Sequence, residues 1–172
     1  LGLKPDYDDN SNALAWLWKD HTRYREAAEI TAAARAVHPE YLARCGGTYS
    51  SEWLWAKLLR CARVDRAVFD AAYTWVELAD WIPAVLTGTT APDRLKRCIC
   101  AAGHKAMFNP AWGGYPAADF IASLDDGALS KVRATLPDTT VNISDRVGTL
   151  TDEWAARLGL RANIPVAAGA FD

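Results

Sequence analysis

The sequence contains no long hydrophobic run, no excess of one charge and no internal repeat. A helix needs roughly 20 consecutive apolar residues to cross a bilayer, and no segment approaches that length. The 19 Lys and Arg residues and 21 Asp and Glu residues give a formal net charge of −2 and are mixed along the chain. A nucleic-acid-binding domain carries a basic patch instead. We therefore expect neither a membrane nor a nucleic-acid partner.

Several short motifs of known chemistry are also missing. The chain has no GxxxxGK[ST] or GxGxxG segment to hold a nucleotide, no HExxH zinc helix and no GxSxG nucleophile elbow. The four cysteines, Cys45, Cys61, Cys98 and Cys100, show neither paired CxxC spacing nor a disulfide framework. Buried reduced thiols are a simpler interpretation than a metal site built from Cys98, Cys100 and His104. We therefore expect no metal site and a cytoplasmic location.

The composition is that of a globular protein. The 172 residues are 51% hydrophobic and 23% charged, which is typical of one domain with a core of its own. The eight tryptophans are the unusual feature. Most are expected in the core, and a few at turns would offer a flat apolar wall to a ligand such as a sugar.

Helical periodicity covers most of the chain. Apolar residues recur at helical spacing between 13 and 36, and Ser50 or Ser51 is placed to cap the next helix. Thr74 and Glu77 have the spacing of a capping box, and Gly88 is a natural stop for the helix that follows. Shorter helices are expected at 39–45, 117–124, 127–135 and 151–160, residues 94–100 are ambiguous between helix and strand, and a strand begins near residue 164.

The final segment, NIPVAAGAFD, has the pattern of a fully buried strand. Natural domains seldom stop at the tip of such a strand, so we expect a fragment of a longer helix-rich α/β protein whose sheet is only partly represented. In open α/β sheets, ligands bind just outside the carboxyl ends of strands. Asp172 follows this strand, where its carboxylate would accept a proton from a bound hydroxyl or, alternatively, cap a helix.

Three other residues are candidates for a binding site. Lys105 lies in an apolar, turn-rich segment, AAGHKAMFNPAWGGYP, where its ammonium group either reaches solvent or is held in a cleft. Trp18 adjoins a charged pair in LWKDH, and Tyr49 lies in GGTYSSEW, which offers hydroxyls and an aromatic ring at a turn. An exposed helix start and ordinary capping are the structural alternatives for the last two segments.

Five segments, taken together and in order, resemble the bacterial ribulokinase family. They are LWKDHT, GGTYSSEWLWAKLL, VELADWIPAVLTGTT, CAAGHKAMFNPAWGGYP and GTLTDEWAARLGL with IPVAAGAFD. The resemblance runs along the full chain and extends to the wider carbohydrate kinases, which include xylulokinase and glycerol kinase. It implies an α/β fold of the ribonuclease H-like, actin-like ATPase type. Residues 1–172 would be the later part of the N-terminal sugar-binding domain, and the nucleotide-binding domain would be absent from this chain.

The resemblance also implies roles for four residues. Asp172 matches the catalytic base, which takes a proton from the terminal hydroxyl of a ketopentose during phosphoryl transfer from ATP with Mg²⁺. Lys105 matches a lysine that contacts the sugar. Trp18 and Tyr49 match, across subfamilies, an aromatic wall and a tyrosine that contact the polyol in glycerol kinase. The longer protein would convert L-ribulose to L-ribulose 5-phosphate in arabinose catabolism, and this chain alone would be inactive and hold no cofactor.

Two alternatives stay open from the sequence. One is a related kinase for another ketose or polyol, such as xylulose or glycerol. The other is a non-catalytic module that binds a sugar or a protein partner through its tryptophan-rich surface. The exact sugar and whether the protein is a homo-oligomer are not determined by the sequence.

Overall fold

The computed structural model describes residues 1–171. These residues are mostly helical and contain one two-stranded sheet. The helices are α1 (Tyr24–Val37), α2 (Leu54–Val64), α3 (Arg66–Ala71), α4 (Leu78–Thr87), α5 (Ile99–Ala106), α6 (Ala118–Ser123), α7 (Ser130–Ala134) and α8 (Asp152–Leu158). The strands are β1 (Arg146–Thr149) and β2 (Pro165–Ala167), and short 3₁₀ helices lie at η1 (Ser11–Ala13), η2 (Pro39–Leu42) and η3 (Pro110–Trp112).

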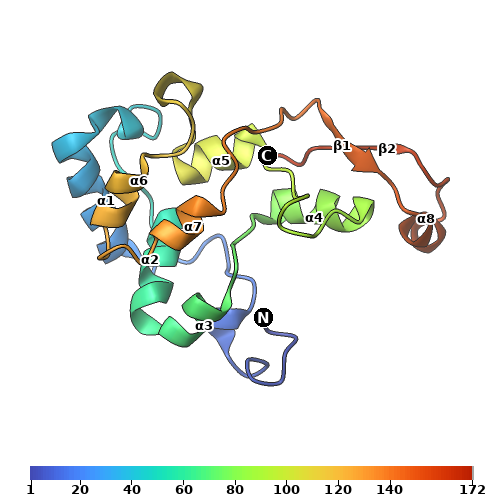
Figure 1. The fold of residues 1–172 in the computed structure, drawn as a ribbon, viewed down its shortest axis with the longest axis horizontal. Coiled ribbons are helices and arrows are strands. Elements are labelled where there is room, and N and C mark those ends of the chain that lie inside the picture. Colours follow the sequence, from blue (N-terminus) through green and yellow to red (C-terminus); the bar gives the residue numbers. More distant parts are fainter. Residues whose placement is uncertain (172) are drawn as a thin grey trace.

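Helix α2 lies at the centre of the main helical body, where it packs against α1, α3 and α5 (Figure 1). Its apolar residues recur at helical spacing, and Trp55, Leu58 and Leu59 are fully buried. Ile30 of α1 and Phe69 of α3 are fully buried in the same cluster. Burying a side chain of this size contributes roughly 1.5–3 kcal/mol, so the apolar stripe of α2 is the main support of this body.

Helix α4, the two strands and α8 extend from the body as an arm (Figure 1). The strands pair antiparallel, with Gly148 opposite Val166, and α4 packs against both. A Cβ atom at Gly148 would lie 2.8 Å from the side chain of Thr87, and one at Gly169 would overlap the carbonyl oxygen of Ala79. The missing side chains at these two glycines let the extended segments approach α4 closely.

The first expected helix begins later than its periodicity predicts. Helix α1 begins at Tyr24, not near residue 13. The preceding residues form turns held by local hydrogen bonds. The Trp16 indole Nε1 donates to the Asn12 carbonyl at 2.9 Å, and the Asp20 carboxylate accepts the Thr22 amide at 2.9 Å. These side-chain bonds compete with the helical ladder and keep residues 14–22 out of it.

The capping box predicted from Thr74 and Glu77 is wrong. Helix α4 begins at Leu78 with Glu77 in the N-cap position, and no side chain caps its first amides. The Thr74 hydroxyl is 2.7 Å from the Thr135 hydroxyl, so it is committed to a distant segment. Glu77 therefore has no capping role, and its carboxylate faces Lys105 instead.

Other local signals have mixed outcomes. Neither predicted serine caps α2, because Ser50 accepts the Glu52 amide and the helix begins at Leu54. The predicted cap at Thr151 is confirmed, since its hydroxyl accepts the Trp154 amide. Residues 94–100, which were ambiguous, form an isolated bridge and then the first turn of α5.

The last strand begins where the sequence predicts but is not buried. In β2, Pro165 and Ala167 are exposed and Val166 is half-buried. Among residues 1–171, β2 pairs only with β1, so most of its surface stays accessible. The expectation of a fully buried strand is wrong for the chain as it stands.

Candidate functional site

Lys105 is held in a half-enclosed position next to a carboxylate. It lies in the last turn of α5, so the segment that reads as turn-rich in the sequence is helical at this residue. Its side chain is 14% exposed, and its Nζ lies 3.6 Å from Oε2 of Glu77. The same Nζ lies 4.5 Å from the centre of the Phe171 ring. An ammonium group between a carboxylate and an aromatic face is attracted to both.

Glu77 is a site residue that sequence reasoning missed. It stands at the junction between an extended segment and α4, with φ −68° and ψ 145°. Its side chain is only partly exposed and faces Lys105 across 28 residues of sequence separation. No local pattern indicates such a pair, because the fold alone brings the two residues together. Together they offer a donor and an acceptor, the combination that a sugar hydroxyl satisfies.

Tyr49 supports this site from within the core. Its side chain is 4% exposed. The hydroxyl accepts the Trp55 amide at 3.0 Å and donates to the backbone carbonyl of Lys105. Burial raises the pKa of Tyr49 well above its ordinary value, so the hydroxyl keeps its proton. This placement argues against direct contact between Tyr49 and a sugar, and it fixes the end of α5 against the start of α2.

An aromatic series runs from Tyr49 to the last described residue. The ring centres of Tyr49 and Trp53 are 5.1 Å apart, and those of Trp53 and His104 are 5.3 Å apart. His104 lies 5.9 Å from Phe171. Edge-to-face contacts at these distances are favourable and hold each ring in one orientation. Lys105 therefore emerges beside an ordered aromatic surface.

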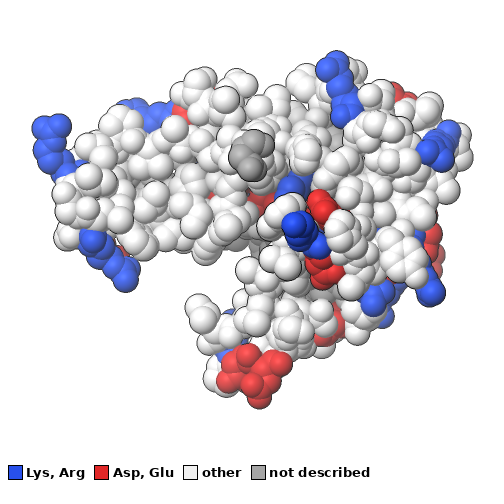
Figure 2. Space-filling model, turned by 180° about the vertical axis from the view of Figure 1, so that it is seen from behind, with Lys and Arg blue, Asp and Glu red and all other residues white. Residues whose placement is uncertain are grey.

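A second lysine belongs to the same charged group. Lys57 of α2 is 8% exposed, and its Nζ donates to the carbonyl of Leu17 at 3.1 Å. Burial lowers the pKa of Lys57, the charge of Lys105 lowers it further, and Glu77 opposes both effects. Figure 2 shows basic and acidic side chains gathered near the centre of one face, where the arm meets the helical body.

Trp18 lies on a turn at the edge of this region. Its side chain is 59% exposed, and Lys19 Nζ lies 5.3 Å from its ring centre. Trp18 follows Leu17, the residue whose carbonyl Lys57 binds. The structure thus connects the Trp18 turn to α2, while Trp18 stays open to solvent. Asp172, the predicted base, lies outside the described residues, and Phe171 is the last residue whose position is described.

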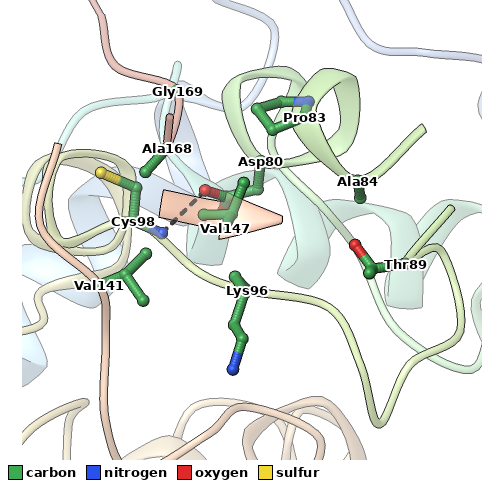
Figure 3. Close-up of a pocket in the computed structure, with 10 residues that line it drawn as sticks. All are labelled: Asp80, Pro83, Ala84, Thr89, Lys96, Cys98, Val141, Val147, Ala168 and Gly169. Atoms are coloured by element: carbon green, nitrogen blue, oxygen red, sulfur yellow. Dashed lines mark hydrogen bonds between the residues drawn. The ribbon is translucent and has the colours of Figure 1, made fainter. Parts of the chain in front are cut away.

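A small enclosed cavity elsewhere is not a sugar site. It lies between α4, the segment at 96–98 and the strands, and Figure 3 shows Asp80 at its wall. Its volume of about 10 Å³ is near the minimum that holds one water molecule. The Asp80 carboxylate accepts the Cys98 amide at 2.8 Å, and burial raises the pKa of Asp80 to about 6. Asp80 therefore joins α4 to the start of α5.

Within residues 1–171, no three His, Cys, Asp or Glu side chains are grouped as metal ligands would be. None of the helices in this part of the chain has both the length and the apolar character needed to span a bilayer.

Comparison with known proteins relates the fold to a class of enzymes. A crystal structure of a xylulose kinase from Brucella ovis matches 90% of this chain and 28% of its own chain, with a TM-score of 0.65 and 25% sequence identity. No family model matches the sequence. The expected fold class is confirmed: this is a helix-rich α/β segment, and its structural neighbour is a sugar kinase of the actin-like ATPase fold.

Curated relatives define the class more closely. The ribulokinase of Vibrio parahaemolyticus is 41% identical over the whole chain, and that of Shouchella clausii is 38% identical over the whole chain. The ribulokinase of Mycolicibacterium smegmatis is 38% identical over 97% of the chain. The chain spans about 30% of the length of these relatives. The resemblance seen in the sequence motifs is confirmed: over its whole length, the chain is similar to a segment of ribulokinases.

Proposed function

We propose that this chain supplies the sugar-binding part of an ATP-dependent ribulokinase that phosphorylates the terminal hydroxyl of L-ribulose. The observation that carries the proposal is the half-enclosed pair formed by Lys105 and Glu77, 3.6 Å apart. It occurs in a chain whose entire length is similar to ribulokinases. A ketopentose carries a carbonyl and several hydroxyls, which need both a cationic donor and an anionic acceptor.

Each candidate residue has a separate part in this proposal. Lys105 donates a hydrogen bond to a sugar oxygen, and Glu77 accepts a hydrogen bond from a neighbouring sugar hydroxyl. Trp18 covers an apolar face of the sugar. Tyr49 holds the backbone of Lys105 in place and does not touch the sugar.

Asp172 is proposed as the general base. Its carboxylate accepts the proton of the terminal hydroxyl as that oxygen bonds to the γ-phosphorus of ATP and the bond to ADP breaks. Phosphoryl transfer depends on alignment and charge neutralisation, so the base mainly orients the attacking oxygen. The preceding residue, Phe171, packs on Lys105 and His104, which supports a role for this segment at the sugar site.

ATP and Mg²⁺ are proposed to bind a nucleotide domain outside residues 1–172. The described residues do not fit either group, because they contain neither a cluster of metal ligands nor a glycine-rich phosphate loop. This chain by itself is therefore expected to release no ADP. The same proposal places the protein in the cytoplasm, in arabinose catabolism.

The proposal is tested with the complete gene product and a coupled assay for ADP release. L-Ribulose is expected to support faster turnover than D-xylulose or glycerol at equal concentration. Asp172→Asn is expected to lower kcat by about 100-fold or more while KM for the sugar changes little, because the base acts in the transition state. Asp93→Asn, at an exposed carboxylate, is the matched control. Full activity of Asp172→Asn would refute the role of Asp172.

The alternatives are less well supported. The xylulose kinase structure is 25% identical to the chain, whereas the ribulokinase of Vibrio parahaemolyticus is 41% identical. A non-catalytic binding module would bind sugar without turnover. Sugar binding by the complete gene product without ADP release would favour that module.

A further inference from the structure

The turn that carries Trp18 is fixed by contacts from other elements. It runs from Leu17 to Asp20, and the Asp20 amide donates to the Leu17 carbonyl at 3.3 Å. Trp18 and Lys19 are its two central residues. A single turn bond of this length is weak, and an exposed turn held by it alone would sample many conformations.

Lys57 strengthens the turn at its first residue. Its Nζ donates to the same Leu17 carbonyl at 3.1 Å, so this oxygen accepts two hydrogen bonds. Lys57 is 8% exposed on α2, the best-buried helix of the molecule, so the anchor is rigid. A charge-assisted bond from a buried ammonium group is stronger than one between neutral groups.

The other end of the turn is fixed separately. The Asp20 carboxylate accepts the Thr22 amide at 2.9 Å and pairs with the guanidinium of the buried Arg23. The amide of Thr22 is the main cause that lowers the pKa of Asp20 to about 2, so the pair stays ionised at neutral pH. Both ends of the turn are therefore held, and the exposed Trp18 ring projects from a fixed base.

We propose that Lys57 is a positioning residue for sugar recognition, which acts by holding the Leu17–Asp20 turn so that Trp18 stands beside the Lys105 and Glu77 pair. The inference rests on the proposed function, because Trp18 matters only if a sugar binds there. Lys57 does not touch the sugar in this account. Its amine is committed to a backbone carbonyl, and its effect reaches the sugar through Trp18.

The test uses the complete gene product and four proteins: wild type, Lys57→Met, Trp18→Ala and the double variant. Met keeps most of the apolar stem and removes the donor. Lys57→Met is expected to raise KM for L-ribulose about tenfold while kcat stays within about twofold, as loss of ground-state binding predicts. The double variant is expected to show the KM of Trp18→Ala alone, since both changes remove one interaction.

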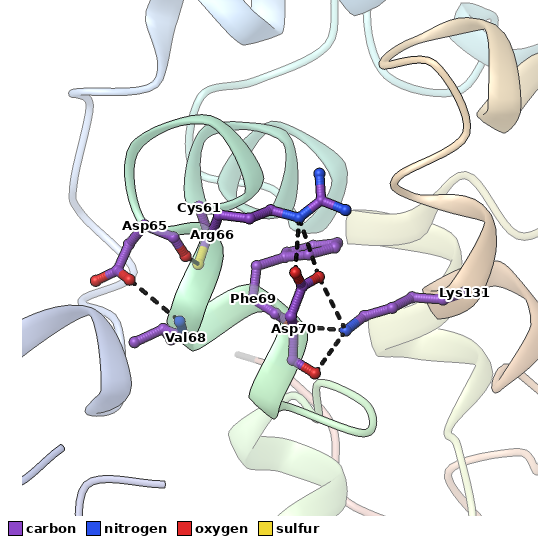
Figure 4. A network of polar contacts seen from close by, with 7 residues as sticks. All are labelled: Cys61, Asp65, Arg66, Val68, Phe69, Asp70 and Lys131. Atoms are coloured by element: carbon purple, nitrogen blue, oxygen red, sulfur yellow. Dashed lines mark hydrogen bonds and ion pairs between the residues drawn. The ribbon is translucent and has the colours of Figure 1, made fainter. Parts of the chain in front are cut away.

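A control separates this role from general destabilisation. Lys131 of α7 also donates to backbone carbonyls, those of Phe69 and Asp70 at the end of α3 (Figure 4). Lys131→Met removes the same kind of bond away from the turn, and it is expected to leave KM unchanged. If Lys57→Met does not fold, Lys57→Gln replaces it, because its polar amide suits the charged surroundings but ends short of Leu17.

Acrylamide quenching of tryptophan fluorescence reports how well the turn holds Trp18, and it needs no catalytic turnover. The contribution of Trp18 is the difference between a protein and its Trp18→Ala counterpart, and Lys57→Met is expected to increase its quenching by roughly 1.3-fold or more. An unchanged Trp18 contribution would overturn the inference. So would an effect on KM that persists in the Trp18→Ala background. If L-ribulose is not phosphorylated at all, the proposed function fails, and the quenching result alone decides the role of Lys57.

Discussion

Replacing Tyr49 by Phe distinguishes a supporting residue from a sugar contact. The hydroxyl of Tyr49 bonds two backbone groups, the Trp55 amide at 3.0 Å and the carbonyl of Lys105. The bond to the Trp55 amide is buried and the bond to the Lys105 carbonyl is partly buried, and Phe leaves both groups without this partner. Each lost hydrogen bond costs about 1 kcal/mol, and an amide left unsatisfied adds roughly 1 kcal/mol more.

The expected loss of unfolding free energy is therefore about 3 kcal/mol, which is roughly a 150-fold change in the folding equilibrium. Urea unfolding of the complete gene product, followed by circular dichroism, measures this loss. KM for L-ribulose, measured at a temperature where the variant stays folded, is expected to change less than about threefold.

Tyr73→Phe is the matched control, because this tyrosine is 68% exposed, and its unfolding free energy is expected to change by less than about 0.5 kcal/mol. A Tyr49→Phe protein as stable as wild type would refute the reasoning from burial and hydrogen bonding. A stable variant with KM raised tenfold or more would restore the direct sugar contact that the sequence resemblance implies.

Two further predictions concern the arm. Burial raises the pKa of Asp80 to about 6, above the ordinary value of 3.8. The folded state therefore binds the proton more tightly than the unfolded state, so this group makes stability fall as pH rises from about 4 to 6, by up to roughly 3 kcal/mol. Asp80→Asn is expected to remove that fall, which urea unfolding at a series of pH values measures; an identical pH profile would contradict the assignment. Gly169→Ala is expected to destabilise the protein by at least about 2 kcal/mol, because its Cβ would overlap the Ala79 carbonyl oxygen. Thermal unfolding checks this, and Gly103→Ala, whose added Cβ would lie 3.4 Å from its nearest neighbour at an ordinary φ, is the matched control.

Local signals predicted part of the fold correctly. Thr151 caps α8 and Gly88 ends α4 because each signal depends on a few neighbouring residues. The apolar residues that recur at helical spacing in α2 are also buried, with Leu58 and Cys61 among them. The helix expected from residue 13 failed because side chains such as Asp20 bond the backbone locally, which hydrophobic periodicity does not register.

The candidate site was less accessible to sequence reasoning. Lys105 was singled out by its apolar surroundings and by family resemblance, but its partner Glu77 was assigned to a helix cap. Their proximity depends on how α4 and α5 pack, and no pattern within either segment contains that information. The burial of Lys57 depends in the same way on a turn 40 residues earlier in the chain.

The side chain and the backbone of Lys105 make separate contacts. Its ammonium group faces Glu77, whereas its carbonyl oxygen is bonded by Tyr49 and belongs to the scaffold. Every amino acid has this backbone carbonyl. A substitution at position 105 would therefore change the side chain that faces Glu77 and leave the hydrogen bond from Tyr49 intact. Under the proposed function, selection for sugar preference would act on this side chain without altering the scaffold bond, and an engineer who seeks a different acceptor has a first position to randomise.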